Sequence, residues 1–296
     1  VQVGTLKEIN AYPIKSCGPV TVDEAELAIL GLKSGWLRDR VLMVVDQNSN
    51  FVTARVYPEM LLVHPLVRNA ILTLTHVDMQ PLHVNLAEVA ALQKVTTATV
   101  WGDPVPVWDC GKEASDWFSK LLDKPEDSFR LVYYANQTSR PLRLGSSKTR
   151  IYNFTKNDSG ALPDEVSYNL INEASVEDLN TRLVNTKAST RNFRPNFVLE
   201  GAGPYDEDGW KFVKIGDHVF QVIKPCGRCV LTTIDPETGV RDPNSEPLQT
   251  LKSYRKHDTA EERKEAGQAP RMGLQMALRS PPGGILRIND PIYVPA

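Results

Sequence analysis

Apolar and polar residues alternate along much of the first half of the chain. A period of two is typical of strands that bury one face. Strands are therefore predicted at residues 1–9, 41–45, 51–54, 71–77, 98–101 and 105–108. The polar residues 46–50 and the Gly-Asp-Pro segment 102–104 lie between neighbouring strands and predict turns. We therefore expect the first half of the chain to be rich in strands.

The period changes to that of a helix after residue 110. The apolar residues of this helix fall on one face and end before Pro125: Ala114, Trp117, Phe118, Leu121 and Leu122. A second helix is predicted from Ser175, with a buried face that includes Val176 and Leu179, and a short charged helix from Thr259. Strands return at residues 197–200, 210–215, 219–223, 285–288 and 292–294.

Residues 136–165 are rich in Asn, Ser, Arg, Gly and Asp, which indicates a long loop or a junction between domains. No segment of 20–50 residues repeats, so solenoids and propellers are excluded. The pattern predicts a mainly β protein with flanking helices, of the α+β class. We expect two parts, residues 1–136 and 137–296.

Composition limits the classes of function. Among 296 residues, 34 are basic and 36 acidic, so the chain carries no overall charge that would bind nucleic acid or an anionic membrane. No apolar run reaches the length of about 18 residues that a membrane span needs. Four cysteines are too few for a disulfide scaffold in a chain of this size, which favours a reducing compartment.

The segment Cys226-Gly-Arg-Cys229 follows a predicted strand and has several interpretations. A structural zinc site needs a second pair of ligands, and no two of the five histidines have ligand spacing. A zinc deaminase needs His-x-Glu or Cys-x-Glu upstream, which is absent. A thioredoxin-like pair normally opens a helix, whereas residues 230–234 favour a strand. The residues favour two further interpretations over these: both cysteines are small buried apolar residues, or one thiolate binds a soft metal beside Arg228.

A second group of residues could bind an anion. Lys15 and Ser16 follow the first strand, Arg40 precedes the strand at 41–45, and Arg194 and Asn196 precede the strand at 197–200. Ammonium and guanidinium groups with hydroxyl and amide donors suit a phosphate ester. Each of them alone is more typical of a surface salt bridge. Their occurrence together with the cysteine pair points to a shared site.

These segments make the chain resemble MOSC proteins, and most closely the amidoxime-reducing components, which are molybdenum enzymes. The matching stretches occur in order along nearly the whole chain: residues 12–17, 31–40, 52–55, 109–111, 172–175, 192–196, 226–239, 246–255 and 290–293. The resemblance implies an N-terminal β-rich domain and a C-terminal MOSC β-barrel, with the molybdenum cofactor (Mo-molybdopterin) between them.

The resemblance also implies a role for individual residues. It makes Cys229, rather than Cys226, the sulfur ligand of molybdenum and therefore the catalytic residue. Residues that match positions holding the pterin and its phosphate are Lys15, Ser16, Arg40, Arg194, Asn196 and Arg228. Asp164 and Ser167 lie where further cofactor contacts fall. Two segments depart from the family pattern, Asp-Glu-Val-Ser at 164–167 and Met-Gly-Leu-Gln-Met at 272–276, and both bear on the pocket wall and the substrate range.

The activity implied by the resemblance is reduction of N-hydroxylated compounds such as amidoximes and hydroxylamines. The sequence has neither a GxGxxG fingerprint nor iron–sulfur spacing, so electrons must come from a partner. The resemblance implies cytochrome b5, reduced by NADH–cytochrome b5 reductase. It also implies attachment to the cytosolic face of the mitochondrial outer membrane through an N-terminal segment that this chain lacks; the chain as given is expected to be soluble. No acid or base for catalysis stands out.

Three other functions remain open on the sequence alone. A non-catalytic carrier of the molybdenum cofactor would use the same cationic residues. A sulfurase-type MOSC module is related to that idea, although this chain has no room for a pyridoxal-phosphate domain. A structural zinc protein is the third, and metal analysis separates it from the other two.

Overall fold

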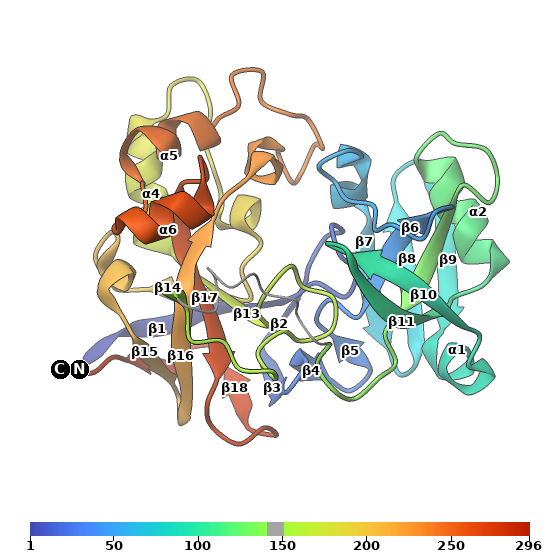
Figure 1. Cartoon of the computed structure of the whole chain (residues 1–296), viewed down its shortest axis with the longest axis horizontal. Coiled ribbons are helices and arrows are strands. Elements are labelled where there is room, and N and C mark those ends of the chain that lie inside the picture. Colours follow the sequence, from blue (N-terminus) through green and yellow to red (C-terminus); the bar gives the residue numbers. More distant parts are fainter. Residues whose placement is uncertain (141–150) are drawn as a thin grey trace.

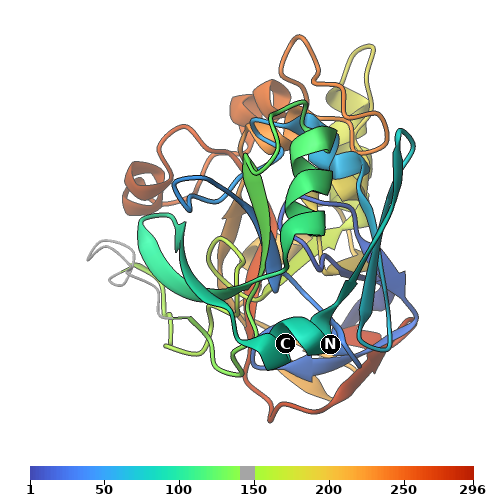
Figure 2. The same ribbon diagram turned by 90° about the vertical axis from the view of Figure 1, so that its right-hand side faces the viewer.

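The computed structural model describes residues 1–140 and 151–296, and it places two groups of elements side by side (Figure 1). One group contains the C-terminal strands together with the first strand of the chain, and the other contains most elements between residues 42 and 133. Val1 donates from its amino group to the carbonyl of Val294 at 2.7 Å, so the termini lie together, as Figure 2 shows.

The first group is built on a closed barrel. Its strands follow in the order β14 (Phe197–Glu200), β13 (Tyr168–Asn172), β17 (Arg271–Leu278), β16 (His218–Gly227), β15 (Phe212–Ile215), β19 (Pro291–Tyr293) and β1 (Gln2–Ala11). Strand β1 pairs again with β14, which closes the barrel, and β2 (Val20–Val22) extends it. The expected strand-rich class and the C-terminal β-barrel are confirmed.

Aromatic side chains fill the interior of this barrel. Tyr168 and Phe197 stack with ring centroids 5.7 Å apart, and Phe220 meets both rings edge-on. Burial of such large apolar surfaces is the main contribution to the stability of the barrel. Because β1 comes from the N-terminal end and pairs with β14 and β19, residues far apart in sequence are fixed at one barrel. The domain boundary at residue 136 stays a prediction.

The second group has two antiparallel sheets. The four-stranded sheet runs β10 (Val95–Val100), β11 (Asp103–Asp109), β12 (Phe129–Tyr133) and β6 (Leu42–Asp46), and the three-stranded sheet runs β7 (His64–Arg68), β8 (Ile71–His76) and β9 (Met79–Asn85). Helices α1 (Leu86–Leu92) and α2 (Lys112–Leu121) belong to this group, and a short 3₁₀ turn, η1, covers Pro58–Leu62. Another four-stranded sheet joins β18 (Ile285–Arg287), β3 (Glu24–Ala28), β4 (Gly31–Ser34) and β5 (Leu37–Arg38).

The predicted helices form, with shifts at their ends. Helix α2 buries Ala114, Trp117 and Phe118, as its apolar stripe predicts. Helix α4 (Glu173–Arg182) begins two residues before the predicted Ser175, because the side chain of Asn172 caps it by accepting from the Ala174 amide. Helices α5 (Leu248–Tyr254) and α6 (Ala260–Ala266) follow, and Thr259 caps α6 as expected.

Three local predictions were wrong. Residues 51–54 form no strand beyond an isolated bridge at Phe51, because the carbonyl of Thr53 accepts from the amides of Val56 and Tyr57 and the chain turns there. The hairpin turns at Trp101 and Gly102, both with positive φ, so Pro104 lies inside β11. Residues 230–233 form the 3₁₀ helix η4 instead of a strand, because the Thr232 and Thr233 hydroxyls bond back to the backbone.

Residues 136–140 and 152–165 form turns and bends, as expected of a junction, and the remainder of that predicted loop, 141–150, lies outside the described residues. No helix in the described ranges is both long and apolar enough to cross a bilayer.

Candidate functional site

A cavity of about 150 Å³ lies where the segments after β1 and β6 meet the barrel. We call it the inner cavity. It gathers all the predicted site residues except Ser167: Lys15, Ser16, Arg40, Asp164, Arg194, Asn196, Arg228 and Cys229. Ser167 does not line it, and its hydroxyl donates to the carbonyl of Asp158 at 3.1 Å. The structure therefore gives Ser167 a place in the loop framework outside the cavity.

Three of the cavity residues have a backbone conformation that side chains rarely adopt. Ser16, Arg40 and Arg194 have φ angles of 71°, 47° and 50°. A non-glycine residue in this left-handed region costs about 1 kcal/mol or more, and such residues concentrate at functional sites. A buried polar network around Arg40 offsets this strain.

Arg40 is held on three sides. It donates to Asp39 at 2.5 Å, to the side-chain oxygen of Asn196 at 3.2 Å, and to the carbonyl of Arg194 at 3.1 Å. The amide nitrogen of Asn196 in turn donates to Asn10 and Asp39. Because both ends of its side-chain amide are engaged by the protein, Asn196 orients Arg40 and adds little direct binding of its own.

Arg228 is likewise engaged by the backbone around it. Its guanidinium donates to the carbonyls of Met272 and Phe193 at 2.6–2.8 Å. Strand β17 lies close to the backbone of Leu170 on β13 because residue 273 is a glycine with a φ of 73°. A Cβ there would come within 2.4 Å of the Leu170 carbonyl oxygen. Arg228 therefore brings positive charge to the cavity wall from a fixed position.

Arg194 retains a donor with no partner. Its Nη1 donates to the carbonyl of Cys17 at 2.7 Å and its guanidinium lies 4.3 Å from the centre of the Tyr12 ring. Its Nη2 is buried and has no hydrogen-bond partner among the described residues. Burial, with a smaller contribution from the nearby Arg40, lowers the pKa of Arg194 to about 10. An unpaired buried cation is expensive, so this donor is suited to an anionic group in the cavity.

Arg55 is a member of the site that was not among the predicted site residues. Its Nε lies 3.4 Å from the sulfur of Cys229, and its Nη2 lies 3.0 Å from Asp164. Arg55 belongs to one of the matching stretches, residues 52–55, so a signal existed. However, 174 positions separate it from Cys229, and nothing local in the sequence indicates that the two meet.

Asp164 is the anionic centre of this part of the site. It pairs with Lys15 and Arg55, and it accepts from the indole nitrogen of Trp101 at 3.0 Å. Burial raises the pKa of the Asp164 carboxyl, but the two cations outweigh this and hold the pKa well below its usual range. Burial lowers the pKa of the Lys15 ammonium despite that pairing. The cations lining the cavity exceed its carboxylates, so an anion is favoured there.

A second, larger cavity of about 460 Å³ shares Cys229, Arg55 and Asp164 with the first. We call it the outer cavity. Cys229 therefore lies on the boundary between a small cationic cavity and a wider one. The described residues contain no cluster of three or more His, Cys, Asp or Glu side chains that could hold a metal, which leaves the structural zinc interpretation without support in this part of the chain.

Comparison with known proteins agrees with this arrangement. Residues 3–125 match the MOSC N-terminal beta barrel domain, and residues 157–293 match the MOSC domain. The chain is 39% identical over 293 residues to mitochondrial amidoxime-reducing component 1 of Mus musculus and 38% identical over 292 residues to component 2 of Bos taurus. It is 37% identical over 295 residues to component 1 of Homo sapiens. Each alignment covers 99% of this chain and 83% of the relative. The chain belongs to the MOSC family, in the branch that contains the mitochondrial amidoxime-reducing components.

Proposed function

We propose that this protein is a molybdenum-cofactor-dependent reductase of N-hydroxylated compounds. The names of its relatives support reduction of an amidoxime. The observation that carries the proposal is the position of the Cys229 sulfur, beside Arg55 and on the wall of a cavity lined by further cations. Soft sulfur ligands suit a redox metal, and cations suit the phosphate of an organic chelate.

The residues present fit such a cofactor. The unpaired Nη2 of Arg194 provides a buried donor for an anion, and Ser16 lines the same wall. When bound, the cofactor would supply two-electron oxygen-transfer chemistry to an N–OH group. Cys229 would be its protein ligand. Lys15, Arg40 and Arg228 would provide positive charge, and Asp164 would keep Lys15 and Arg55 in place.

The reaction consumes two electrons and two protons for each N–OH group, and it releases the amine or amidine and one water molecule. We assign the electrons to cytochrome b5, reduced by NADH–cytochrome b5 reductase. The outer cavity gives a small substrate access to the Cys229 side of the site. The names of the relatives support a mitochondrial location, which we extend to the cytosolic face of the outer membrane.

Two cysteine variants test the proposal directly. Cys229→Ala should lose molybdenum and reduction of benzamidoxime, because the metal would lack its sulfur ligand. Cys226→Ala is the matched control. Cys226 is buried, and its sulfur accepts only a long contact of 3.7 Å from Gln275. The Cys226→Ala variant should retain most of its molybdenum and most of its activity with benzamidoxime. Full activity of Cys229→Ala with reduced cytochrome b5 would refute the assignment of this residue.

Metal analysis and turnover separate the alternatives. About one molybdenum atom per chain with turnover from reduced cytochrome b5 supports the reductase. Molybdenum without turnover would instead indicate a carrier or a sulfurase-type module. Zinc at one atom per chain would overturn the proposal altogether.

A further inference from the structure

The outer cavity contains charged groups that already have partners. Lys224 and Glu165 lie 2.5 Å apart, Arg55 pairs with Asp164, and Arg140 lies 3.7 Å from Asp103. Paired charges of this kind gain little from an additional charged ligand. The recognition of a ligand in this cavity must therefore come mainly from groups that are polar and unpaired.

Buried polar atoms without a hydrogen-bond partner among the described residues belong to three residues of the outer cavity. They are Nε and Nη1 of Arg140, both ring nitrogens of His257 and the side-chain oxygen of Gln275. The Arg140 guanidinium already lies near Asp103 and donates to the carbonyl of Pro163, which leaves His257 and Gln275 as the uncharged groups. His257 is only 4% exposed. Buried polar atoms are nearly always hydrogen-bonded, and leaving one unpaired carries a large desolvation cost. The three unpaired atoms on the uncharged side chains of His257 and Gln275 therefore point to a ligand that pairs with them.

Burial and the neighbouring charges determine the protonation state of the His257 ring. His257 lies between α5 and α6, and its carbonyl accepts from the guanidinium of Arg263 at 2.9 Å. Burial lowers the pKa of the His257 imidazole, with Glu262 opposing this and Arg271 and Lys224 adding to it. The ring is therefore neutral at neutral pH and offers one donor and one acceptor.

Gln275 lies at the boundary between the two cavities. It lies on β17, lines both the inner and the outer cavity, as Cys229 does, and donates from its amide nitrogen to Cys226 at 3.7 Å. This contact leaves its oxygen as an acceptor for an N–H group at that boundary. His257 lines the outer cavity but not the inner one, so it faces a more distant part of any bound molecule. Trp101 adds a flat aromatic surface, 59% exposed, to the same cavity.

We propose that the outer cavity binds the organic part of the substrate, with Gln275 accepting from the N–H next to the reacting N–OH and His257 hydrogen-bonding a second polar group further along. This inference rests on the proposed function. It names the preferred class as uncharged, planar N-hydroxylated compounds that carry a second hydrogen-bonding atom, such as a ring nitrogen. A site that hydrogen-bonds its substrate discriminates against an analogue that lacks the bonding atom.

Binding without turnover tests this proposal. Calorimetry on the cofactor-loaded protein, with no electron donor, would compare benzamidoxime with the three positional isomers of pyridine carboxamidoxime. We expect the best isomer to bind about three- to tenfold more tightly than benzamidoxime. His257→Phe should abolish that preference, and His257→Asn should keep part of it. Equal preference in His257→Phe and the wild type would overturn the inference.

Two further variants complete the design. Gln275→Met should weaken benzamidoxime and the pyridine compounds by the same factor, because its oxygen faces the group they share; unchanged binding would contradict its role. His83→Phe, an exposed histidine on β9, is the matched control and should change nothing. Thermal melting checks the folding of each variant. If the wild type binds with the expected preference but never turns over, the proposed function fails while this binding site stands. If the wild type turns over but shows no such preference, the proposed function stands while this binding site fails.

Discussion

The guanidinium of Arg55 joins the sulfur of Cys229 to the carboxylate of Asp164. One edge of the group serves both, with Nε 3.4 Å from the sulfur and Nη2 3.0 Å from the carboxylate oxygen. Two neighbouring donors of one rigid plane thus fix the separation of the two acceptors. The N–H donor would change the electron density that this sulfur offers to a bound metal, as hydrogen bonds to metal ligands commonly do.

Replacing Arg55 should therefore impair the site without unfolding the protein. In Arg55→Gln the sulfur loses its charged donor, and we expect turnover with benzamidoxime to fall about 10- to 100-fold, the range of one charge-assisted hydrogen bond. Arg55→Lys keeps the charge but cannot serve both acceptors, so it should recover only part of the loss. Turnover per bound molybdenum is the measurement. Wild-type turnover in Arg55→Gln would contradict this role.

Arg194 should be needed for the cofactor and not for the fold. Arg194→Met removes the unpaired buried donor, so the cofactor-free variant should melt at or above the wild-type temperature. Its molybdenum content after loading should fall about tenfold, because an anion loses its charged partner. Arg191→Met is the control, since Arg191 is exposed and pairs with Glu237. Normal loading of Arg194→Met would show that the cation holds no ligand.

Trp101 supports Asp164 from the surface. Its indole donates to the carboxylate at 3.0 Å, and its ring lies 5.4 Å from the Arg55 guanidinium. Trp101→Phe keeps an aromatic ring but loses the donor, so we expect turnover to fall about three- to tenfold, as for one neutral hydrogen bond. Trp36→Phe, also exposed, serves as the control. Equal kinetics for the two variants would exclude a contribution from the indole N–H.

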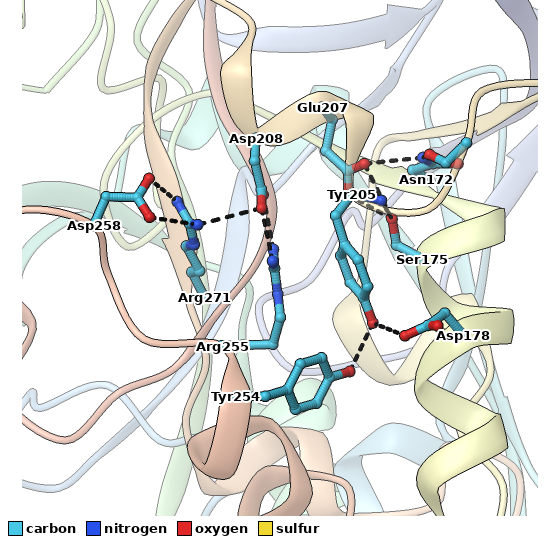
Figure 3. A network of polar contacts seen from close by, with 11 residues as sticks. Asn172, Ser175, Asp178, Tyr205, Glu207, Asp208, Tyr254, Arg255, Asp258 and Arg271 are labelled. Atoms are coloured by element: carbon cyan, nitrogen blue, oxygen red, sulfur yellow. Dashed lines mark hydrogen bonds and ion pairs between the residues drawn. The ribbon is translucent and has the colours of Figure 1, made fainter.

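A second polar network surrounds η3 (Asp206–Gly209), and Figure 3 shows it. Glu207 is fully buried and accepts from Asn172 and Ser175 at 2.8–3.0 Å. A neighbouring branch pairs Arg255 with Asp208 and Arg271 with Asp258. The network ties η3 to helix α4, to the segment after α5 and to β17. It thus supports the strand that also contains Gln275.

Glu207 should give the protein a measurable dependence of stability on pH. Burial raises the pKa of its carboxyl, while the hydrogen bonds from Asn172 and Ser175 partly oppose this. The folded state therefore keeps the proton to a higher pH than the unfolded chain does. Its contribution to stability is complete below the unfolded pKa of about 4.3 and is lost as the pH rises through the folded pKa, at about 1.4 kcal/mol per pKa unit.

The matched variant is Glu207→Gln, which cannot ionise. Relative to it, the wild type should lose unfolding free energy as the pH rises from about 4 towards neutrality. Urea unfolding across this range measures the difference. Glu261→Gln, on the exposed face of α6, should follow the wild type at every pH. A constant difference between wild type and Glu207→Gln would mean that the pKa of Glu207 is not raised.

Parts of the fold could be predicted because their signals are local. The apolar stripe of Ala114, Trp117 and Phe118 specifies helix α2 by its spacing alone. Prediction failed where side chains bond to nearby backbone. The hydroxyls of Thr232 and Thr233 bond back to the backbone and form η4 where the sequence favours a strand. These bonds depend on backbone geometry that composition does not encode.

The candidate site divides in the same way. Lys15, Arg40 and Arg194 could be selected because each lies next to a strand and matches a family motif. The different role that each residue has in the site could not be predicted from the sequence. The side-chain amide of Asn196 is hydrogen-bonded to Arg40 and to the backbone, and Ser167 lies outside the cavity. Arg194 keeps a buried donor that has no partner among the described residues.

The sequence alone determined the strand-rich class, the family and most of the charged residues, since these depend on periodicity and motifs within short stretches. Only the tertiary structure decided which groups meet at Cys229. Closure of the barrel by β1 against β14 fixes the first strand beside the C-terminal half of the chain, and packing of the folded chain brings Arg55 to Asp164 and Cys229. Contacts between residues so far apart depend on how the sheets pair and pack, and no local pattern records that.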